Sequence, residues 1–227
     1  MRLTSLRLSP AGKRWMVPGL KKYFCDLSLD PNTAYRHLSL SDDNRTMTWV
    51  KEAHQRPNHE DGFTYYAQVL GDTELKGCCY WEVDWAGQGG VSIAATYKGI
   101  SRKGKGMECR FGDNDLSWSL RICDGDYFFW HNNIYTSNIS SGKGGVSSDR
   151  KGMSSGRVGV FLDFEGGALS FYRVSADGEL FHLHTFCSSF SEPLFPGFRL
   201  WTEGSSLSLV KKEEIVSSSK CGASFYD

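Results

Sequence analysis

The chain lacks an excess of charge of either sign and lacks a long hydrophobic run. Its 227 residues carry 26 Lys and Arg against 26 Asp and Glu, so the formal net charge is zero. A neutral domain offers no strong positive field to nucleic acid or to an anionic membrane, and the composition argues against both as partners. No apolar run reaches the roughly 18 residues of a membrane span, and the charged start, Met1 to Arg14, does not resemble a secretion signal. We expect a cytoplasmic protein without a membrane span.

Cysteine occurs seven times, but not with the spacing of a disulfide framework or a zinc site. The number is odd, no C-x-x-C pair occurs, and Cys78 and Cys79 are adjacent. This pattern predicts reduced thiols throughout. His182 and His184 could share one face of a strand, but no third ligand accompanies them at a fixed spacing. We expect neither a metal nor a cofactor.

Helical spacing of apolar residues is scarce, whereas alternation of apolar and polar residues is frequent. Tyr80 to Trp85, Val91 to Tyr97 and Leu116 to Ile122 place large apolar side chains at every second position, as half-buried strands do. Val158 to Phe164 alternates in the same way and ends at Glu165-Gly166-Gly167, after which the pattern resumes. That arrangement predicts a hairpin with a glycine turn.

Shorter strands are expected at 38–40, 46–50, 180–186, 198–201 and 207–210. Parallel sheets need a helix for each crossover, so the shortage of helical patterns excludes them. The sequence therefore predicts an all-β antiparallel sandwich of at least nine strands, with one short helical turn near Pro18 to Phe24. Loops are expected at 52–62, 99–106 and 137–156, where the alternation breaks.

One catalytic motif occurs in an unsuitable context. Gly152-Met153-Ser154-Ser155-Gly156 matches the G-x-S-x-G pattern, and Asp163 and His182 follow in the order of a hydrolase triad. The motif requires a strand before the serine and a helix after it. Here a Gly- and Ser-rich loop precedes the serine and a strand follows it, so we predict no catalytic site.

Four short motifs occur in a fixed order along the chain. They are Leu29-Asp30-Pro31-Asn32-Thr33-Ala34 with Leu38-Ser39-Leu40-Ser41, then Trp81-Glu82-Val83, Leu162-Asp163-Phe164-Glu165 and Pro193-Leu194-Phe195-Pro196. In this order they resemble the L-D-P-x-T-A, W-E-V, L-D-Y-E and P-L-x-P motifs of the PRY-SPRY (B30.2/SPRY) family, with Phe164 in place of tyrosine. The resemblance implies a bent sandwich of two antiparallel sheets with variable loops on one face.

The resemblance also implies a domain organisation. The PRY-SPRY domain is expected over residues 18–210, with PRY at about 20–50 and SPRY at about 63–210. Pro18 to Cys25 most closely resembles the fish branch, where such domains end NOD-like receptors of the NLRC type and follow leucine-rich repeats. Residues 1–17, with L-x-x-L-x-L spacing at Leu3 to Leu8, are then the end of a repeat or a linker. The polar tail 211–227 is expected to be disordered.

The functional expectation follows from that family. The chain is expected to be a non-catalytic protein-protein recognition module, the partner-sensing C-terminal domain of an intracellular innate-immune protein. Similar domains end the tripartite-motif ubiquitin ligases. The alternative is the cell-targeting domain of a secreted cytolysin of the stonefish type, which has the same fold.

The partner, a protein or peptide, is expected on a concave face that includes the strand Leu116 to Cys123. Its even-numbered residues carry the apolar pattern, so Arg121 and Cys123 should point away from the core. In the family these two positions offer aromatic residues to the partner. Other contact positions fall near Lys98 and at Phe190, and the loop 52–62, with Arg56 and His59, forms one wall. The alternatives are that Arg121 is an ordinary solvated residue and that Phe190 plugs the core.

Overall fold

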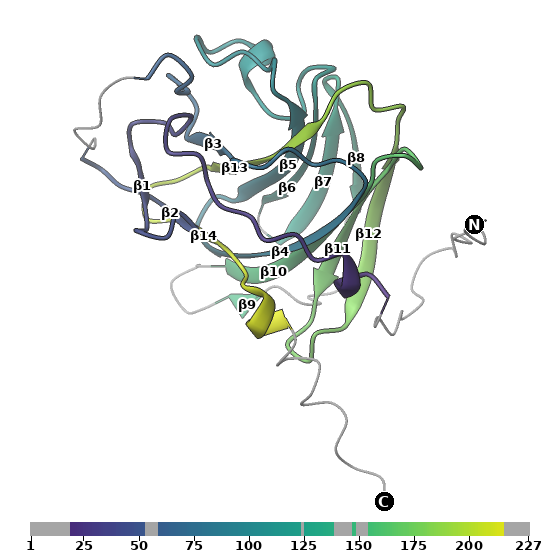
Figure 1. Ribbon diagram of the computed structural model, residues 1–227. Coiled ribbons are helices and arrows are strands. Elements are labelled where there is room, and N and C mark those ends of the chain that lie inside the picture. The colour runs from purple at the N-terminus through teal and green to yellow at the C-terminus, as the bar shows by residue number, and fades with distance from the viewer. Residues whose placement is uncertain (1–18, 53–58, 124, 139–146, 149–153, 216–227) are drawn as a thin grey trace, which may run out of the picture.

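Two antiparallel sheets make up the computed structural model of the chain (Figure 1), which describes residues 19–52, 59–123, 125–138, 147–148 and 154–215. The eight-stranded sheet has the order β1 (Leu38–Leu40), β2 (Thr46–Trp49), β14 (Ser206–Leu209), β4 (Cys78–Gly87), β10 (Ser154–Asp163), β11 (Ala168–Val174) and β12 (Leu180–Cys187), with β9 (Ser147–Ser148) beside β10. The six-stranded sheet has the order β3 (Gln68–Leu70), β13 (Leu194–Leu200), β5 (Val91–Tyr97), β6 (Ser117–Cys123), β7 (Asp126–His131) and β8 (Ile134–Asn138). The predicted all-β sandwich is confirmed.

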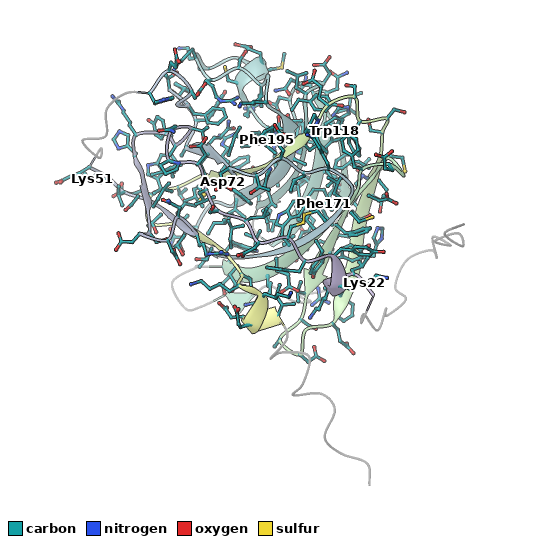
Figure 2. The ribbon with its side chains drawn as sticks, in the orientation of Figure 1. Lys22, Lys51, Asp72, Trp118, Phe171 and Phe195 are labelled. Carbon is teal, nitrogen blue, oxygen red and sulfur yellow. A yellow bond between two sulfur atoms is a disulfide. The ribbon has the colours of Figure 1, made fainter. Side chains whose placement is uncertain are left out.

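The main core lies between the two sheets and follows the predicted alternation. Trp81, Val83 and Trp85 of β4 are buried in it, as are Trp118 and the other even-numbered residues of β6. Figure 2 labels Trp118 on one sheet and Phe171 on the other. Because successive strand side chains point to opposite faces, the odd-numbered residues of β6 lie on the outer face of the six-stranded sheet.

The predicted helical turn near the start is confirmed as a 3₁₀ helix, η1 (Lys21–Tyr23), and a second one, η2 (Met107–Cys109), interrupts the chain between β5 and β6. Helical residues 212–215 follow β14, and Ile215 is buried with Tyr80 and Phe161. None of the helices among the described residues is long and apolar enough to cross a membrane. The expected repeat end, 1–17, and residues 216–227 of the expected tail, 211–227, lie outside the described residues.

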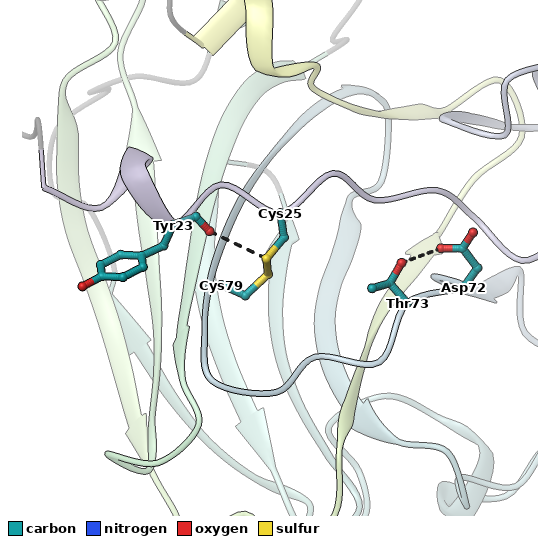
Figure 3. Close-up of a disulfide and its surroundings, with 5 residues drawn as sticks. All are labelled: Tyr23, Cys25, Asp72, Thr73 and Cys79. Atoms are coloured by element: carbon teal, nitrogen blue, oxygen red, sulfur yellow. Dashed lines mark hydrogen bonds between the residues drawn. A yellow bond between two sulfur atoms is a disulfide. The ribbon is translucent and has the colours of Figure 1, made fainter.

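A disulfide attaches the segment before β1 to strand β4 (Figure 3). Cys25 and Cys79 are 54 residues apart in the sequence, with 5.5 Å between their Cα atoms, and the Cys25 N–H donates to the carbonyl of Tyr80. The prediction of reduced thiols throughout is therefore wrong for this pair. Spacing along the sequence does not reveal it, because the two residues meet only when the segment folds back along β4. The other described cysteines, Cys78, Cys109, Cys123 and Cys187, form no disulfide.

Strands β3, β7 and β8 were not predicted from the sequence. The β7–β8 hairpin turns at Asn132 and Asn133, which have φ angles of 49° and 58°. Asparagine tolerates this left-handed conformation, and two such residues form the tight turn that suits a hairpin. Aromatic residues occupy both faces of β7, so that strand shows no alternation of apolar and polar residues.

Candidate partner-binding face

A row of residues crosses the outer face of the six-stranded sheet. The strand register places Arg199 of β13 opposite Ser92 of β5, Ser92 opposite Arg121 of β6, and Arg121 opposite Phe128 of β7. Arg199 stands between two main-core residues of its strand, Phe198 and Leu200, and therefore points outward. We call the set formed by Tyr66, Arg110, Arg121, Trp130, Arg199 and Trp201 the arginine face.

Arg121 points away from the main core, as predicted, but it is buried. Only 5 % of the residue is exposed, because the segment between β5 and β6 covers it. Its Nη2 donates to the Phe111 carbonyl at 2.7 Å and to the carboxylate of Asp113, and its guanidinium lies 4.1 Å from the centre of the Trp130 ring. The interpretation of Arg121 as a solvated strand residue is wrong.

Asp113 is the carboxylate at the centre of this arrangement. Its side chain is fully buried and accepts hydrogen bonds from Arg110 as well as from Arg121. A buried charge is expensive unless it is paired, so Asp113 stabilises both guanidinium groups.

Arg199 lacks such a partner. Its guanidinium carbon lies 4.5 Å from the centre of the Tyr66 ring and 4.7 Å from that of Trp201. Its Nε and Nη1 atoms are buried and donate to no acceptor within the described part of the chain. Burial and the positive charges of Arg121 and Arg110 lower the pKa of Arg199 to about 10. The group therefore remains charged at neutral pH.

Apolar side chains surround the arginine face. Tyr65 is 54 % exposed beside Tyr66, Met107 is 53 % exposed one turn before Arg110, and Tyr135 is 54 % exposed. The Tyr135 ring stacks on Trp130 at 4.7 Å. These three residues, which we call the apolar rim, are among the four exposed large hydrophobic residues in the described ranges; the fourth is Ile134.

The structure does not bring all the predicted contact residues together. Lys98 is exposed, with its Nζ 5.8 Å from the Phe195 ring, and it follows the end of β5 that is remote from Ser92. His59 is exposed and its Nδ1 lies 3.6 Å from Asp61. Cys123 is half-buried at the end of β6. Arg56 lies outside the described residues.

Phe190 belongs to a different place. Its ring meets that of Trp118 edge-on at 5.1 Å and stacks on Phe164 at 5.9 Å. Trp118 faces the main core, whereas Arg121 faces away from it, so Phe190 is not part of the arginine face. The half-buried ring packs on the core, as the alternative predicted, and lines an open surface hollow of about 580 Å³ beside Cys187.

Sequence reasoning missed most of the arginine face. Arg199 and Trp201 stand at the outward positions of a strand that was predicted, so the alternation that placed Arg121 could have placed them too. Asp113 had no such signal, because it lies in a loop whose path over the sheet is set by tertiary packing.

The serine motif does not assemble into a triad. Ser154 and Asp163 are the two ends of β10, nine residues apart, which is about 30 Å along a strand. His182 is exposed on β12, where its Nε2 lies 2.8 Å from the Thr185 hydroxyl. No group of three or more His, Cys, Asp or Glu side chains suited to a metal ion occurs within the described ranges.

The fold and this face define a β-sandwich domain with a cationic, aromatic surface on one sheet. The SPRY domain model matches residues 78–212, and the model of the SPRY-associated domain, PRY, matches residues 27–75. The chain therefore belongs to the SPRY domain family.

The relatives include a tripartite motif-containing protein and a toxin subunit. The chain is 36 % identical over 198 residues to tripartite motif-containing protein 14 of Mus musculus, covering 86 % of this chain and 41 % of that protein. It is 35 % identical over 198 residues to stonustoxin subunit alpha of Synanceia horrida, covering 83 % of this chain and 26 % of the toxin subunit. The chain thus spans less than half the length of either relative.

Two solved structures have the same fold. The crystal structure of the TRIM65 PSpry domain superposes with a TM-score of 0.71 at 25 % identity, covering 87 % of this chain and 98 % of that one. The stonustoxin structure superposes with a TM-score of 0.70 at 32 % identity, covering 85 % of this chain and 30 % of the toxin chain.

Proposed function

We propose that this chain is a non-catalytic recognition module that binds a protein or peptide through the arginine face, and that this face is the concave binding face of the domain. The observation that carries the proposal is the combination of buried and half-buried arginine and aromatic side chains with an exposed apolar rim. Arginine, tyrosine and tryptophan are the residues that contribute most at protein interfaces. Exposed apolar side chains gathered on one face also mark interaction surfaces.

We further propose that the module senses a partner within an intracellular innate-immune protein, such as a NOD-like receptor, and that it works in the cytoplasm. The similarity to tripartite-motif proteins supports this setting. No nucleic acid and no cofactor enters the proposal. Lys98, Cys123, Arg56 and His59 are proposed as additional contacts.

A second candidate is the targeting domain of a secreted stonefish-type cytolysin. The Cys25–Cys79 disulfide favours it, because disulfides persist in oxidising compartments and are rare in the cytosol. The similarity to stonustoxin supports it as well. Trapping free thiols with an alkylating reagent in intact expressing cells distinguishes the two settings: a cytosolic protein would be labelled at Cys25 and Cys79, and a secreted one would not.

The proposed binding face can be tested with peptides that are selected from a displayed random library by their binding to the full chain. We expect Tyr135→Ala and Met107→Ala each to weaken the selected peptides by about 1 to 2 kcal/mol, because both side chains are exposed and contribute contact area. His182→Ala, an exposed change on the other sheet, is the control. If affinity survives both rim changes, the arginine face is not the binding site.

A further inference from the structure

We propose that Arg199, with Arg121 beside it, binds the carboxylate of an Asp or Glu side chain of the protein partner, so that the arginine face selects acidic segments flanked by apolar residues. This inference rests on the proposed function and names the chemistry that the face recognises.

The first argument is the balance of charge. Arg110 and Arg121 share one buried carboxylate, Asp113, and Arg199 has none. Arg121 and Arg110 act on Arg199 with repulsive positive charge, and Asp113 offsets this only in part. An unpaired charge that is largely removed from water carries a free-energy cost, and an incoming anion would relieve it.

The second argument is the set of guanidinium donors that have no acceptor. The Nε and Nη1 of Arg199 and the Nε of Arg121 are buried and donate to no acceptor among the described residues, whereas the Nη2 of Arg121 donates to Phe111 and Asp113. A carboxylate would reach these donors only after the neighbouring side chains shift. The two arginines flank Ser92 on strands that are two apart, about 10 Å between backbones, so their long side chains can converge on one group. Stacking on Tyr66 and Trp201 restrains the Arg199 guanidinium, and a restrained planar fork suits a carboxylate.

The third argument concerns the kind of anion. A phosphate dianion would bring two negative charges close to Asp113, which already lies against Arg121, whereas a carboxylate brings one. The Tyr65, Met107 and Tyr135 side chains add apolar contact area around the charge. A single acidic side chain on a protein segment can contact both the arginines and the apolar rim, which a free ion cannot do.

The experiment uses three peptide pools displayed to the full chain. The pools have identical random flanks and differ only in a central residue, which is Glu, Gln or phosphoserine. We expect the wild-type chain to retain the Glu pool at least tenfold better than the Gln pool, as charge-assisted bidentate hydrogen bonds would give. Arg199→Met should abolish that preference, and Arg199→Lys should reduce it, because lysine keeps the charge but loses the fork.

Arg173→Met is the matched control. Arg173 also stacks on an aromatic ring, that of Phe181 at 4.1 Å, but it belongs to β11 of the other sheet. It should keep the full preference for Glu. If the Arg199→Met variant does not fold, two other measurements take its place. One is the Arg199→Lys variant, and the other is the Nε–H signal of Arg199 in the NMR spectrum of the wild-type chain. That signal should shift when a Glu peptide is added and should not shift with its Gln analogue.

The outcomes separate the two proposals. Peptides that bind at the face, weakened by Tyr135→Ala but with no preference for Glu over Gln, would overturn the carboxylate inference and leave the proposed function standing. A stronger preference for phosphoserine than for Glu would also overturn it. Binding that ignores Tyr135→Ala would instead contradict the proposed function itself.

Discussion

A single buried carboxylate organises the polar residues of the arginine face. Asp113 accepts hydrogen bonds from Arg110 and Arg121, and the Arg121 guanidinium in turn covers the Trp130 ring. The Arg121–Asp113 pair also holds the segment between β5 and β6 on the sheet, because Arg121 donates to the Phe111 carbonyl of that segment. Arg121 therefore stabilises the domain, whatever its role in binding.

We predict that Asp113→Asn destabilises the domain by about 3 to 5 kcal/mol, because it leaves Arg121 as a buried charge without a counterion. Urea unfolding followed by tryptophan fluorescence measures the effect. Asp115→Asn, at an exposed position two residues further on, should change the free energy of unfolding little. Arg121→Ala should also lower the melting temperature, so a loss of binding in that variant would not by itself identify a contact.

We also predict that stability falls when the pH drops below about 6.5. The half-buried His184 ring stacks on Phe129 at 4.5 Å, and burial, followed by the charge of His182, lowers the pKa of His184 from 6.5. Below pH 6.5 the unfolded chain therefore binds more protons than the folded one, so the free energy of unfolding rises with pH between the folded pKa and 6.5. The stability that neutral His184 contributes is present above this range and is lost as the pH falls through it. Unfolding curves from pH 5 to 7.5 measure the slope, which should decrease in His184→Leu. An unchanged slope in that variant would contradict the assignment.

Among the elements, the segment between β5 and β6 covers part of the six-stranded sheet and supplies Arg110 and Asp113 to the arginine face. Phe111 packs beneath it with Phe63 and Phe195, in a second core cluster outside the sandwich. Gly197 of β13 leaves the room for this ring: a Cβ at that position would come within 2.8 Å of the Phe111 Cζ.

Gly197→Ala is therefore expected to displace Phe111 and to cost about 1 to 3 kcal/mol, as overpacking of a dense core does. Thermal unfolding measures the loss. Gly99→Ala provides the matched comparison, because nothing lies within 4 Å of a Cβ there. Equal melting temperatures for the two variants would show that Phe111 can move without cost.

The strands also show which parts of the fold can be predicted from the sequence. Alternation predicted β4, β5, β6 and the β10–β11 hairpin, because each has one face on the main core. It gave the direction of Arg121 but not its burial, since a strand pattern does not tell which loop will cover the outer face. It missed β7, where Tyr127 and Phe129 enter the core while Phe128 and Trp130 lie on the other side, so that both faces are aromatic.

At the scale of the whole molecule, the segment before β1 is part of the sandwich. The PRY part that follows it is built in too: strand β2 pairs with β14, and Leu38 and Met47 are fully buried. The Cys25–Cys79 disulfide fixes the segment before β1 to β4. The PRY and SPRY parts therefore share one core, which short strands such as β1 and β2 could not form alone.

We predict that Cys25→Ser lowers the free energy of unfolding, by at most about 4 kcal/mol for a closed loop of this length, because the unfolded chain gains conformational entropy. Urea unfolding of the oxidised wild type and the variant measures it, and Cys187→Ser, at an exposed thiol, is the control. Mass spectrometry of the non-reduced wild type should show two hydrogens fewer than after reduction. A mass that does not change on reduction would contradict the disulfide.

The two ends of the described chain share one side of the molecule. Leu20 and Tyr23 near the start, and Ile215 at the end, all pack with Tyr80 on the outer face of the eight-stranded sheet, whereas the arginine face is the outer face of the other sheet. A support, dye or fused domain attached near Gly19 or Ile215 would thus be held behind the sandwich. Immobilised through either point, the protein would present Tyr66, Arg199 and Trp130 to the solution, which is the orientation that a surface-based binding assay requires.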